Sequence, residues 1–199
     1  LDDIDQLITP QHVIDEAATA ETYDRICEAV GDLIDVDLDR SPSYNVWSAD
    51  LSSDLGWLRG IEHFMLDMHD TPDKLHRLMA FMRDGILNAH RQATEAGDWG
   101  LSSSTNLTMP YVEGLPAPAA NVRGVSTKEL SWFTPSQEFT LVSPAMHEEF
   151  LLNYQLPIME QFGLIAYGCC EDLTNKINML RKIPNLRRIG VAPVANLAR

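Results

Sequence analysis

Apolar positions recur at helical spacing in several parts of the chain. The clearest pattern predicts a helix over 72–96, where leucine, methionine and isoleucine return every three or four residues. Thr71 can cap this helix, Pro72 suits its first position, and Gly97 can end it. Similar signals predict further helices over 10–30, 51–69 as two short pieces, 143–162 with a kink at Pro157, and 172–183.

Short apolar runs between these helices predict strands. They cover residues 33–38, 44–47, 99–102, 138–142, 164–169 and 188–191. Residues 103–135 are rich in Ser, Pro, Gly and Asn and show little periodicity, which predicts a long loop covering an active site. The N-terminal residues 1–40 are expected to contribute a helix and a strand to the same domain, which spans 1–199.

The alternation of strands and helices after residue 97 favours parallel strands joined by crossover helices. A doubly wound sheet and a (β/α)8 barrel both satisfy this order. No glycine-rich phosphate-binding loop follows a predicted strand, which weakens the nucleotide-binding version. A complete barrel needs eight strands and about 250 residues. We therefore expect an α/β fold of the (β/α)8 TIM-barrel type, with only part of the barrel present in this chain.

The chain is acidic, with a formal net charge of −14 over 199 residues. This charge argues against nucleic acid and anionic membranes as partners, because both bind basic surfaces. No apolar run approaches the roughly 20 residues that a membrane-spanning helix needs. Three cysteines, two of them adjacent, cannot form a disulfide framework, so reduced thiols and a cytoplasmic location are expected.

The densest chemical cluster follows the run 164–169, which leads directly into adjacent thiols and carboxylates. Catalytic groups of α/β proteins lie at the carboxyl ends of strands, and zinc prefers thiolate, imidazole and carboxylate ligands. Tyr167, Cys169 and Glu171 would share one face if the strand continues. Cys170 joins them after a turn, and His147 from the preceding helix is a further candidate ligand. Alternatively, the cysteines are small buried residues, and Glu171 and Asp172 cap the next helix.

Other candidate site residues follow the remaining strands. Trp47 and Asp50 come after the run 44–47, where Asp50 can equally cap a helix. Asn106 and Tyr111 lie in the long loop, where they can cover a small-molecule substrate. Solvated or partly packed helix surfaces are expected for the remaining helical histidines, namely His63, His69, His76 and His90.

Several segments resemble the uroporphyrinogen decarboxylase-like family. They are residues 58–67 (LRGIEHFMLD), 70–78 (DTPDKLHRL), 143–150 (SPAMHEEF) and 167–171 (YGCCE). The resemblance extends from about residue 10 to the end of the chain. It implies a (β/α)8 barrel and one of two reactions. One is decarboxylation of a tetrapyrrole without a cofactor. The other is methyl transfer from a corrinoid to a thiol that zinc activates.

The methyltransferase branch is the better match. The family's arginine-rich amino-terminal segment has no counterpart here, and an acidic chain is a poor host for a substrate with many carboxylates. Cys169 matches the cysteine of that branch's His-x-Cys motif, whereas Tyr167 stands where the motif has histidine. With the candidates above, this implies zinc held by Cys169, Cys170, Glu171 and His147. Tyr167 and Glu171 would act in catalysis, and a corrinoid protein would be the partner.

Two alternatives stay open. Cofactor-free decarboxylation of uroporphyrinogen or a related carboxylic acid would be indifferent to chelators. A non-catalytic binding or scaffold unit would leave edge strands exposed, and these could pair with a second copy of the chain in a homodimer.

Overall fold

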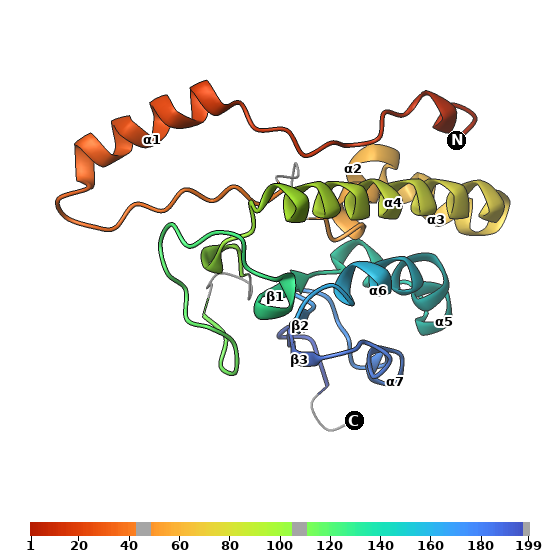
Figure 1. Cartoon of the computed structure of the whole chain (residues 1–199). Coiled ribbons are helices and arrows are strands. Elements are labelled where there is room, and N and C mark those ends of the chain that lie inside the picture. Colours follow the sequence, from red (N-terminus) through yellow and green to blue (C-terminus); the bar gives the residue numbers. More distant parts are fainter. Residues whose placement is uncertain (43–48, 105–110, 197–199) are drawn as a thin grey trace.

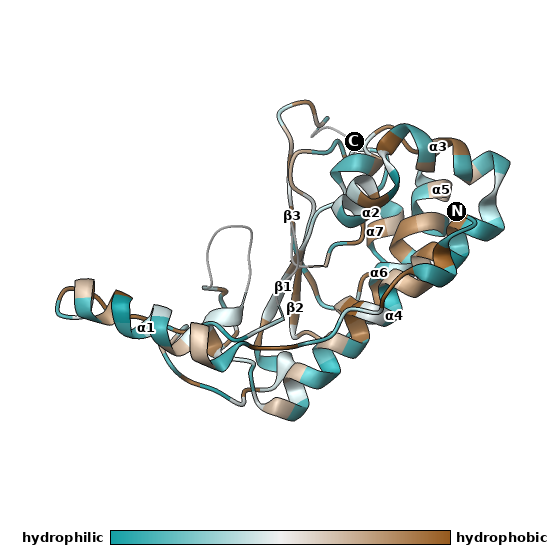
Figure 2. Ribbon diagram, turned by 90° about the horizontal axis from the view of Figure 1, so that it is seen from above, coloured by the Kyte–Doolittle hydropathy of each residue, from teal (hydrophilic) through white to brown (hydrophobic). Residues whose placement is uncertain are grey.

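The structure is a computed structural model that describes residues 1–42, 49–104 and 111–196. It is a mixed α/β structure in which a helical layer covers one side of a small parallel sheet (Figures 1 and 2). The strands are β1 (Ser131–Thr134), β2 (Leu164–Tyr167) and β3 (Leu186–Ile189), in the order β1-β2-β3. The described ranges therefore contain parallel strands with intervening helices, but they do not show a closed barrel.

The helices before the sheet are α1 (Glu16–Val30), α2 (Ser52–Arg59), α3 (Ile61–Asp70) and α4 (Pro72–Ala96). The helices between its strands along the chain are α5 (Pro144–His147), a π-helical turn (Glu148–Leu152), α6 (Asn153–Met159) and α7 (Ile177–Leu180). Short 3-10 turns cover Ile4–Gln6, Leu101–Ser103, Thr127–Glu129 and Gln137–Phe139.

The most periodic helices are confirmed. α4 begins with a proline in its first turn and ends at Gly97, whose φ of 72° is the left-handed conformation that glycine adopts without strain. The segment 51–69 forms two helical pieces, α2 and α3. The helix predicted over 143–162 is divided by the π-helical turn, and Pro157 lies inside its last piece.

The two faces of the sheet differ in what covers them. Figure 2 shows α4, α6 and α7 on one side, and Trp132 of β1 stacks on Phe162 there with ring centroids 4.4 Å apart. Ile165 and Tyr167 of β2 belong to the same buried core. Alternate residues such as Ala166 face the other side, away from α4, α6 and α7, where two grooves follow the strands. We call this second side the uncovered face.

Several strand predictions are wrong. Residues 33–38 form a turn and an extended stretch without a strand partner, and 99–102 make one isolated bridge from Gly100 before a 3-10 turn. The segment 138–142 is not a strand, because its first residues end a 3-10 turn that buries Phe139 against Phe64 and the rest continue as a turn. Conversely, β1 lies inside the predicted loop 103–135. The predicted strand 44–47 lies outside the described residues.

Three boundaries also move. β2 is confirmed but ends at Tyr167, because Gly168 turns the chain with a φ of 87°. β3 is confirmed but starts two residues before the predicted run. The C-terminal helix shrinks to α7, and the first helix starts at Glu16 instead of residue 10.

The first 15 residues run along α4 instead of continuing α1 (Figure 1). Pro10 packs on Gly85 of α4 so closely that a Cβ there would lie 2.7 Å from the proline ring. The backbone N–H of His12 donates to the Gln92 side chain at 2.8 Å. α1 itself has no buried residue and projects from the body of the molecule. None of the helices in the described ranges combines the length and apolarity needed to span a bilayer.

Candidate functional site

The predicted site lies where β2 ends and the chain turns. After Gly168, the buried Glu171 reaches back beneath the turn, and its Oε2 accepts from the Cys169 N–H at 2.7 Å. Its Oε1 accepts from both the backbone N–H and the hydroxyl of Ser136, each at 2.7 Å. Glu171 therefore fastens the turn after β2 to the turn after β1. It does not cap the next helix, which starts only at Ile177.

The two cysteines stay together at the edge of this turn. Their Sγ atoms lie 3.4 Å apart, Cys170 is exposed and Cys169 is half-buried. Cys169 lines a groove of about 350 Å³ on the uncovered face, together with Phe133, Ala166 and Arg188. Burial, reinforced by the neighbouring Cys170, raises the pKa of the Cys169 thiol to about 11. A bound cation would therefore be needed to hold this thiol deprotonated at neutral pH.

Tyr167 and His147 are brought together, but inside the helical layer. Both are fully buried, and His147 Nε2 lies 2.9 Å from the Tyr167 hydroxyl. That hydroxyl donates to Gln155 Oε1 at 2.9 Å, so His147 Nε2 must donate to it and Nδ1 carries no proton. Burial, and secondarily the charge of Lys176, lowers the pKa of His147 to about 3. His147 is therefore a neutral packing residue of this site and is directed at Tyr167.

Gln155 is the residue at this site that the sequence analysis did not single out. Its Nε2 donates to the Asp50 carbonyl oxygen at 2.6 Å and lies 3.4 Å from Thr134 Oγ1. It thus links α6 to β1 and to the segment before α2. Its position between apolar neighbours on a helix was the available signal, because a buried amide needs partners on other elements.

Asp50 is placed as a cap instead of a substrate ligand. Its Oδ1 accepts from the Ser53 N–H at 2.7 Å, which confirms the capping alternative. The side chain is fully buried, and Oδ2 has no hydrogen-bond partner among the described residues. Burial raises the pKa of Asp50 to about 8, against the opposing hydrogen bonds from Ser53. Asp50 is therefore largely a neutral acid at pH 7.

Of the other three predicted substrate residues, the structure describes only Tyr111. Tyr111 is 55% exposed and lines a second groove of about 360 Å³ on the uncovered face. Ser131, Ala166 and Arg188 line the same groove, so it lies next to the groove at Cys169. Trp47 and Asn106 lie outside the described residues.

The predicted zinc ligands do not converge as a set. Within 1–42, 49–104 and 111–196, no three His, Cys, Asp or Glu side chains are placed to hold a metal ion. Cys169 and Cys170 supply two thiol donors. With Zn–S bonds of about 2.3 Å, their 3.4 Å separation gives an S–Zn–S angle of about 95°, somewhat below the tetrahedral value. The pair therefore fits half of a zinc site after a small side-chain rotation.

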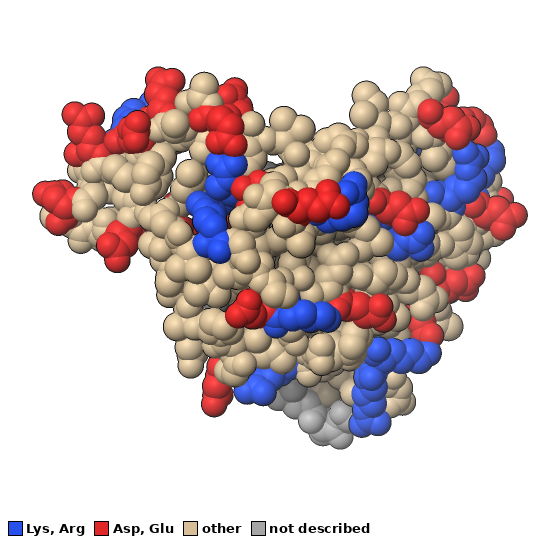
Figure 3. All heavy atoms as spheres, viewed as in Figure 1, with Lys and Arg blue, Asp and Glu red and all other residues tan. Residues whose placement is uncertain are grey.

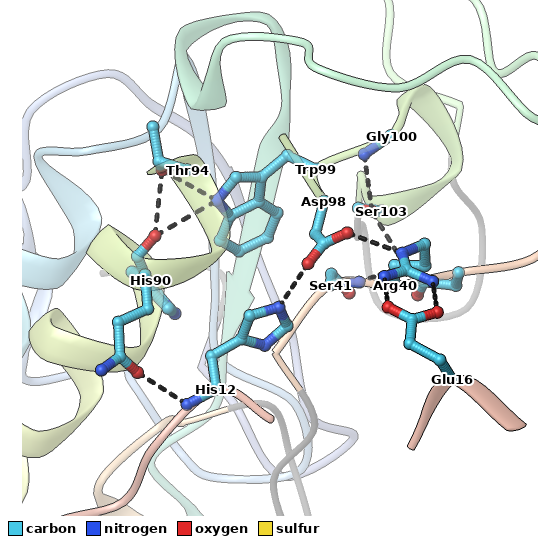
Figure 4. Close-up of polar contacts among 12 residues, drawn as sticks. His12, Glu16, Arg40, Ser41, His90, Thr94, Asp98, Trp99, Gly100 and Ser103 are labelled. Atoms are coloured by element: carbon cyan, nitrogen blue, oxygen red, sulfur yellow. Dashed lines mark hydrogen bonds and ion pairs between the residues drawn. The ribbon is translucent and has the colours of Figure 1, made fainter. Parts of the chain in front are cut away.

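A second polar cluster, formed by His12, Glu16, Arg40 and Asp98, was not predicted (Figure 4). Asp98 accepts from His12 Nε2 at 2.8 Å and from Arg40 Nε at 2.6 Å. Arg40 also forms a two-point ion pair with Glu16 at the start of α1. Burial opposes ionisation of Asp98, yet the hydrogen bonds from Arg40 and His12 hold its pKa below the ordinary value. This cluster fastens the N-terminal segment to the end of α4.

His90 differs from its predicted surface position. It is buried on α4, where Nδ1 lies 2.9 Å from Gln161 Oε1 and the ring packs edge-on against Trp99, Trp132 and Phe162. Burial lowers the pKa of His90 to about 4, so it is a neutral core residue.

Comparison with protein families, with curated proteins and with solved structures returned no match to this chain.

Proposed function

We propose that this chain is part of a (β/α)8-barrel enzyme of the uroporphyrinogen decarboxylase-like type. It would transfer a methyl group from a corrinoid carried on a partner protein to a thiol-type acceptor with the help of zinc. The observation that carries the proposal is the thiol pair of Cys169 and Cys170, 3.4 Å apart at the carboxyl end of β2 and beside a groove. The carboxyl ends of barrel strands are where such enzymes place their chemistry.

The sheet supports the architectural part of the proposal. Its strands are parallel, and their helices lie on one side (Figure 2). In a barrel, the side away from the helices becomes the interior, and substrates enter at the carboxyl end. The uncovered face, with both grooves and Tyr111 beside them, would correspond to that interior.

The residues have distinct roles in this reading. Cys169 and Cys170 would hold zinc, and the bound ion would lower the pKa of an acceptor thiol so that it becomes nucleophilic at neutral pH. Glu171 fixes the backbone of Cys169 through its N–H and so positions the thiol pair. The acceptor thiol would supply a further ligand. His147 drops out as a first choice because it is fully buried inside the helical layer with its Nε2 on Tyr167, and Glu171 because both of its carboxylate oxygens accept protein hydrogen bonds.

Metal analysis tests the proposal directly. The purified chain is loaded with Co²⁺ in place of Zn²⁺, and the thiolate-to-cobalt absorption is measured together with the bound metal per chain. We expect binding that Cys169→Ser and Cys170→Ser weaken strongly. Cys27→Ser is the matched control, because Cys27 lies on α1 and should leave binding unchanged. Equal metal content in all four proteins, or none in any, would contradict the zinc part of the proposal.

One observation favours the decarboxylase alternative. Arg188 lines both grooves, and a guanidinium is well suited to bind a substrate carboxylate. Decarboxylation of a carboxylic acid there would continue in the presence of a chelator and would weaken in Arg188→Gln. Loss of activity on chelation would instead favour methyl transfer.

A further inference from the structure

We propose that Cys169 and Cys170 are a site of reversible oxidation, at which the adjacent thiols join in a vicinal disulfide. The inference concerns the thiol pair itself and does not depend on zinc, on the corrinoid or on a closed barrel. Methyl transfer would require only that this segment bind a metal, whereas oxidation would modify the segment covalently.

The geometry already brings the sulfur atoms close. Their separation of 3.4 Å exceeds a disulfide bond of about 2.05 Å by an amount that side-chain rotation can supply. The turn that carries them is anchored, because Gly168 reverses the chain and Glu171 holds the Cys169 N–H. Cys27 lies on the projecting α1 in a different part of the molecule, so it does not compete within one chain (Figure 1).

The chemistry balances with a peroxide as the oxidant. The exposed Cys170 reacts first, and its sulfur becomes a sulfenic acid while the peroxide O–O bond breaks and one water is released. Cys169 sulfur then attacks the sulfenic sulfur. The S–S bond forms, the S–O bond breaks, and the hydroxyl leaves as a second water with the proton of the Cys169 thiol. Two thiols lose two electrons, and the peroxide gains them.

The resulting bond would be easy to reduce. Adjacent Cα atoms are about 3.8 Å apart across a trans peptide, whereas common disulfides span about 4.4–6.8 Å between Cα atoms. A disulfide between neighbours is therefore strained, and strained or exposed disulfides belong to the labile class. We expect the dithiol under reducing conditions and the disulfide only under oxidant. Both sulfur donors of the pair would then be withdrawn together.

Thiol counting tests this directly. The reduced, metal-free chain is treated with hydrogen peroxide, the peroxide is removed with catalase, and the chain is denatured and alkylated. The number of alkyl groups counts the remaining thiols, while mass spectrometry locates the linkage. We expect a fall from three free thiols to one, a mass loss of two hydrogens on the peptide carrying Cys169 and Cys170, and full recovery with dithiothreitol. The folded chain should react faster than the same chain in urea, because its turn holds the sulfur atoms together.

Two variants sharpen the outcome. Cys27→Ser should pass from two thiols to none, whereas Cys170→Ser should form no intramolecular disulfide. A linkage that involves Cys27, or a folded chain that keeps all three thiols while the unfolded chain oxidises, would overturn the inference. A chain that forms the disulfide but binds no cobalt would support this inference and contradict the proposed zinc chemistry. A chain that binds cobalt but forms no disulfide would support the proposed zinc chemistry and contradict this inference.

Discussion

At the residue scale, Tyr167 is the centre of a fully buried hydrogen-bonded chain. Replacing it by phenylalanine would leave the His147 Nε2–H without an acceptor and Gln155 Oε1 without a donor. We expect Tyr167→Phe to lower the free energy of unfolding by about 1–3 kcal/mol, the usual cost of unpaired buried polar groups. Urea unfolding measures it. Tyr111→Phe, on an exposed tyrosine, is the control and should change little. Equal changes in the free energy of unfolding in the two variants would show that these hydrogen bonds do not contribute to stability.

Asp50 predicts a pH dependence of stability. Its folded-state pKa of about 8 lies above the ordinary 3.8, so between these values the unfolded chain releases a proton that the folded chain keeps. Stability should therefore fall as pH rises from about 4 to about 8 and level off above that.

Asp50→Asn removes this proton but keeps the shape of the neutral acid. We expect the variant to gain stability relative to the unsubstituted chain as pH rises from 5 to 8, by at most about 4 kcal/mol. Urea unfolding at several pH values measures the difference, in which the other titrating groups cancel. A difference that stays constant with pH would mean that Asp50 is ionised in the folded chain.

Local chemistry was predictable at this scale, and distant partners were not. Cys169 at a strand end and Asp50 as a cap both depend on residues within a few positions. The role of Glu171 depends on Ser136, and that of Tyr167 on His147 and Gln155. These partners are brought together only by strand pairing and helix packing. No pattern in the sequence shows which distant groups will meet.

At the scale of elements, residues 8–40 form an N-terminal segment, called the strap below. It is held to α4 by His12 and to Asp98 by His12 and Arg40. Asp98→Ala would remove the shared partner of His12 and Arg40 (Figure 4). We expect about 1–3 kcal/mol weaker protection of residues 8–40 in hydrogen exchange and faster tryptic cleavage at Arg25. Asp84→Ala, which breaks the more exposed pair with Arg83, should leave both unchanged.

The same strap should be sensitive to acid. The pKa of Asp98 lies below its ordinary value of 3.8, so its contribution is present above about pH 4 and is lost as pH falls through the folded-state pKa. Cleavage within residues 8–40 by pepsin, which is active in acid, should therefore rise below about pH 4 in the unsubstituted chain but not further in Asp98→Ala.

Long periodic elements were predictable, and short buried ones were not. α4 offers many repeats of one pattern and two capping signals, so local propensity and packing agree. β1 is four residues long and buried throughout, so its serine and threonine obscured the strand inside a polar loop. At 138–142 the apolar residues matched a strand, yet only Phe139 among them enters the core. Tertiary packing decided both cases.

At the scale of the whole molecule, charge is unevenly distributed. Figure 3 shows acidic side chains gathered on the projecting α1 end and basic side chains near α7. Arg187 and Arg188 lie at the groove beside Tyr111. The net charge of −14 therefore describes the chain's average and not its grooves. An anionic substrate is less disfavoured there than composition alone implies, which keeps the carboxylic acid alternative open.

The uncovered face predicts a further property of the whole molecule. Val191 is 59% exposed and lines the groove at Cys169, whereas Leu141 is 90% exposed and lines neither groove. An apolar dye should bind this chain at the uncovered face, because contiguous apolar surface binds such dyes and scattered residues do not. Val191→Glu should reduce the dye fluorescence by roughly half or more, with the far-UV circular dichroism preserved. Leu141→Glu adds the same charge and should change neither signal. If both variants reduce the fluorescence equally, charge rather than the sheet face controls binding, and a barrel interior at this face loses its support.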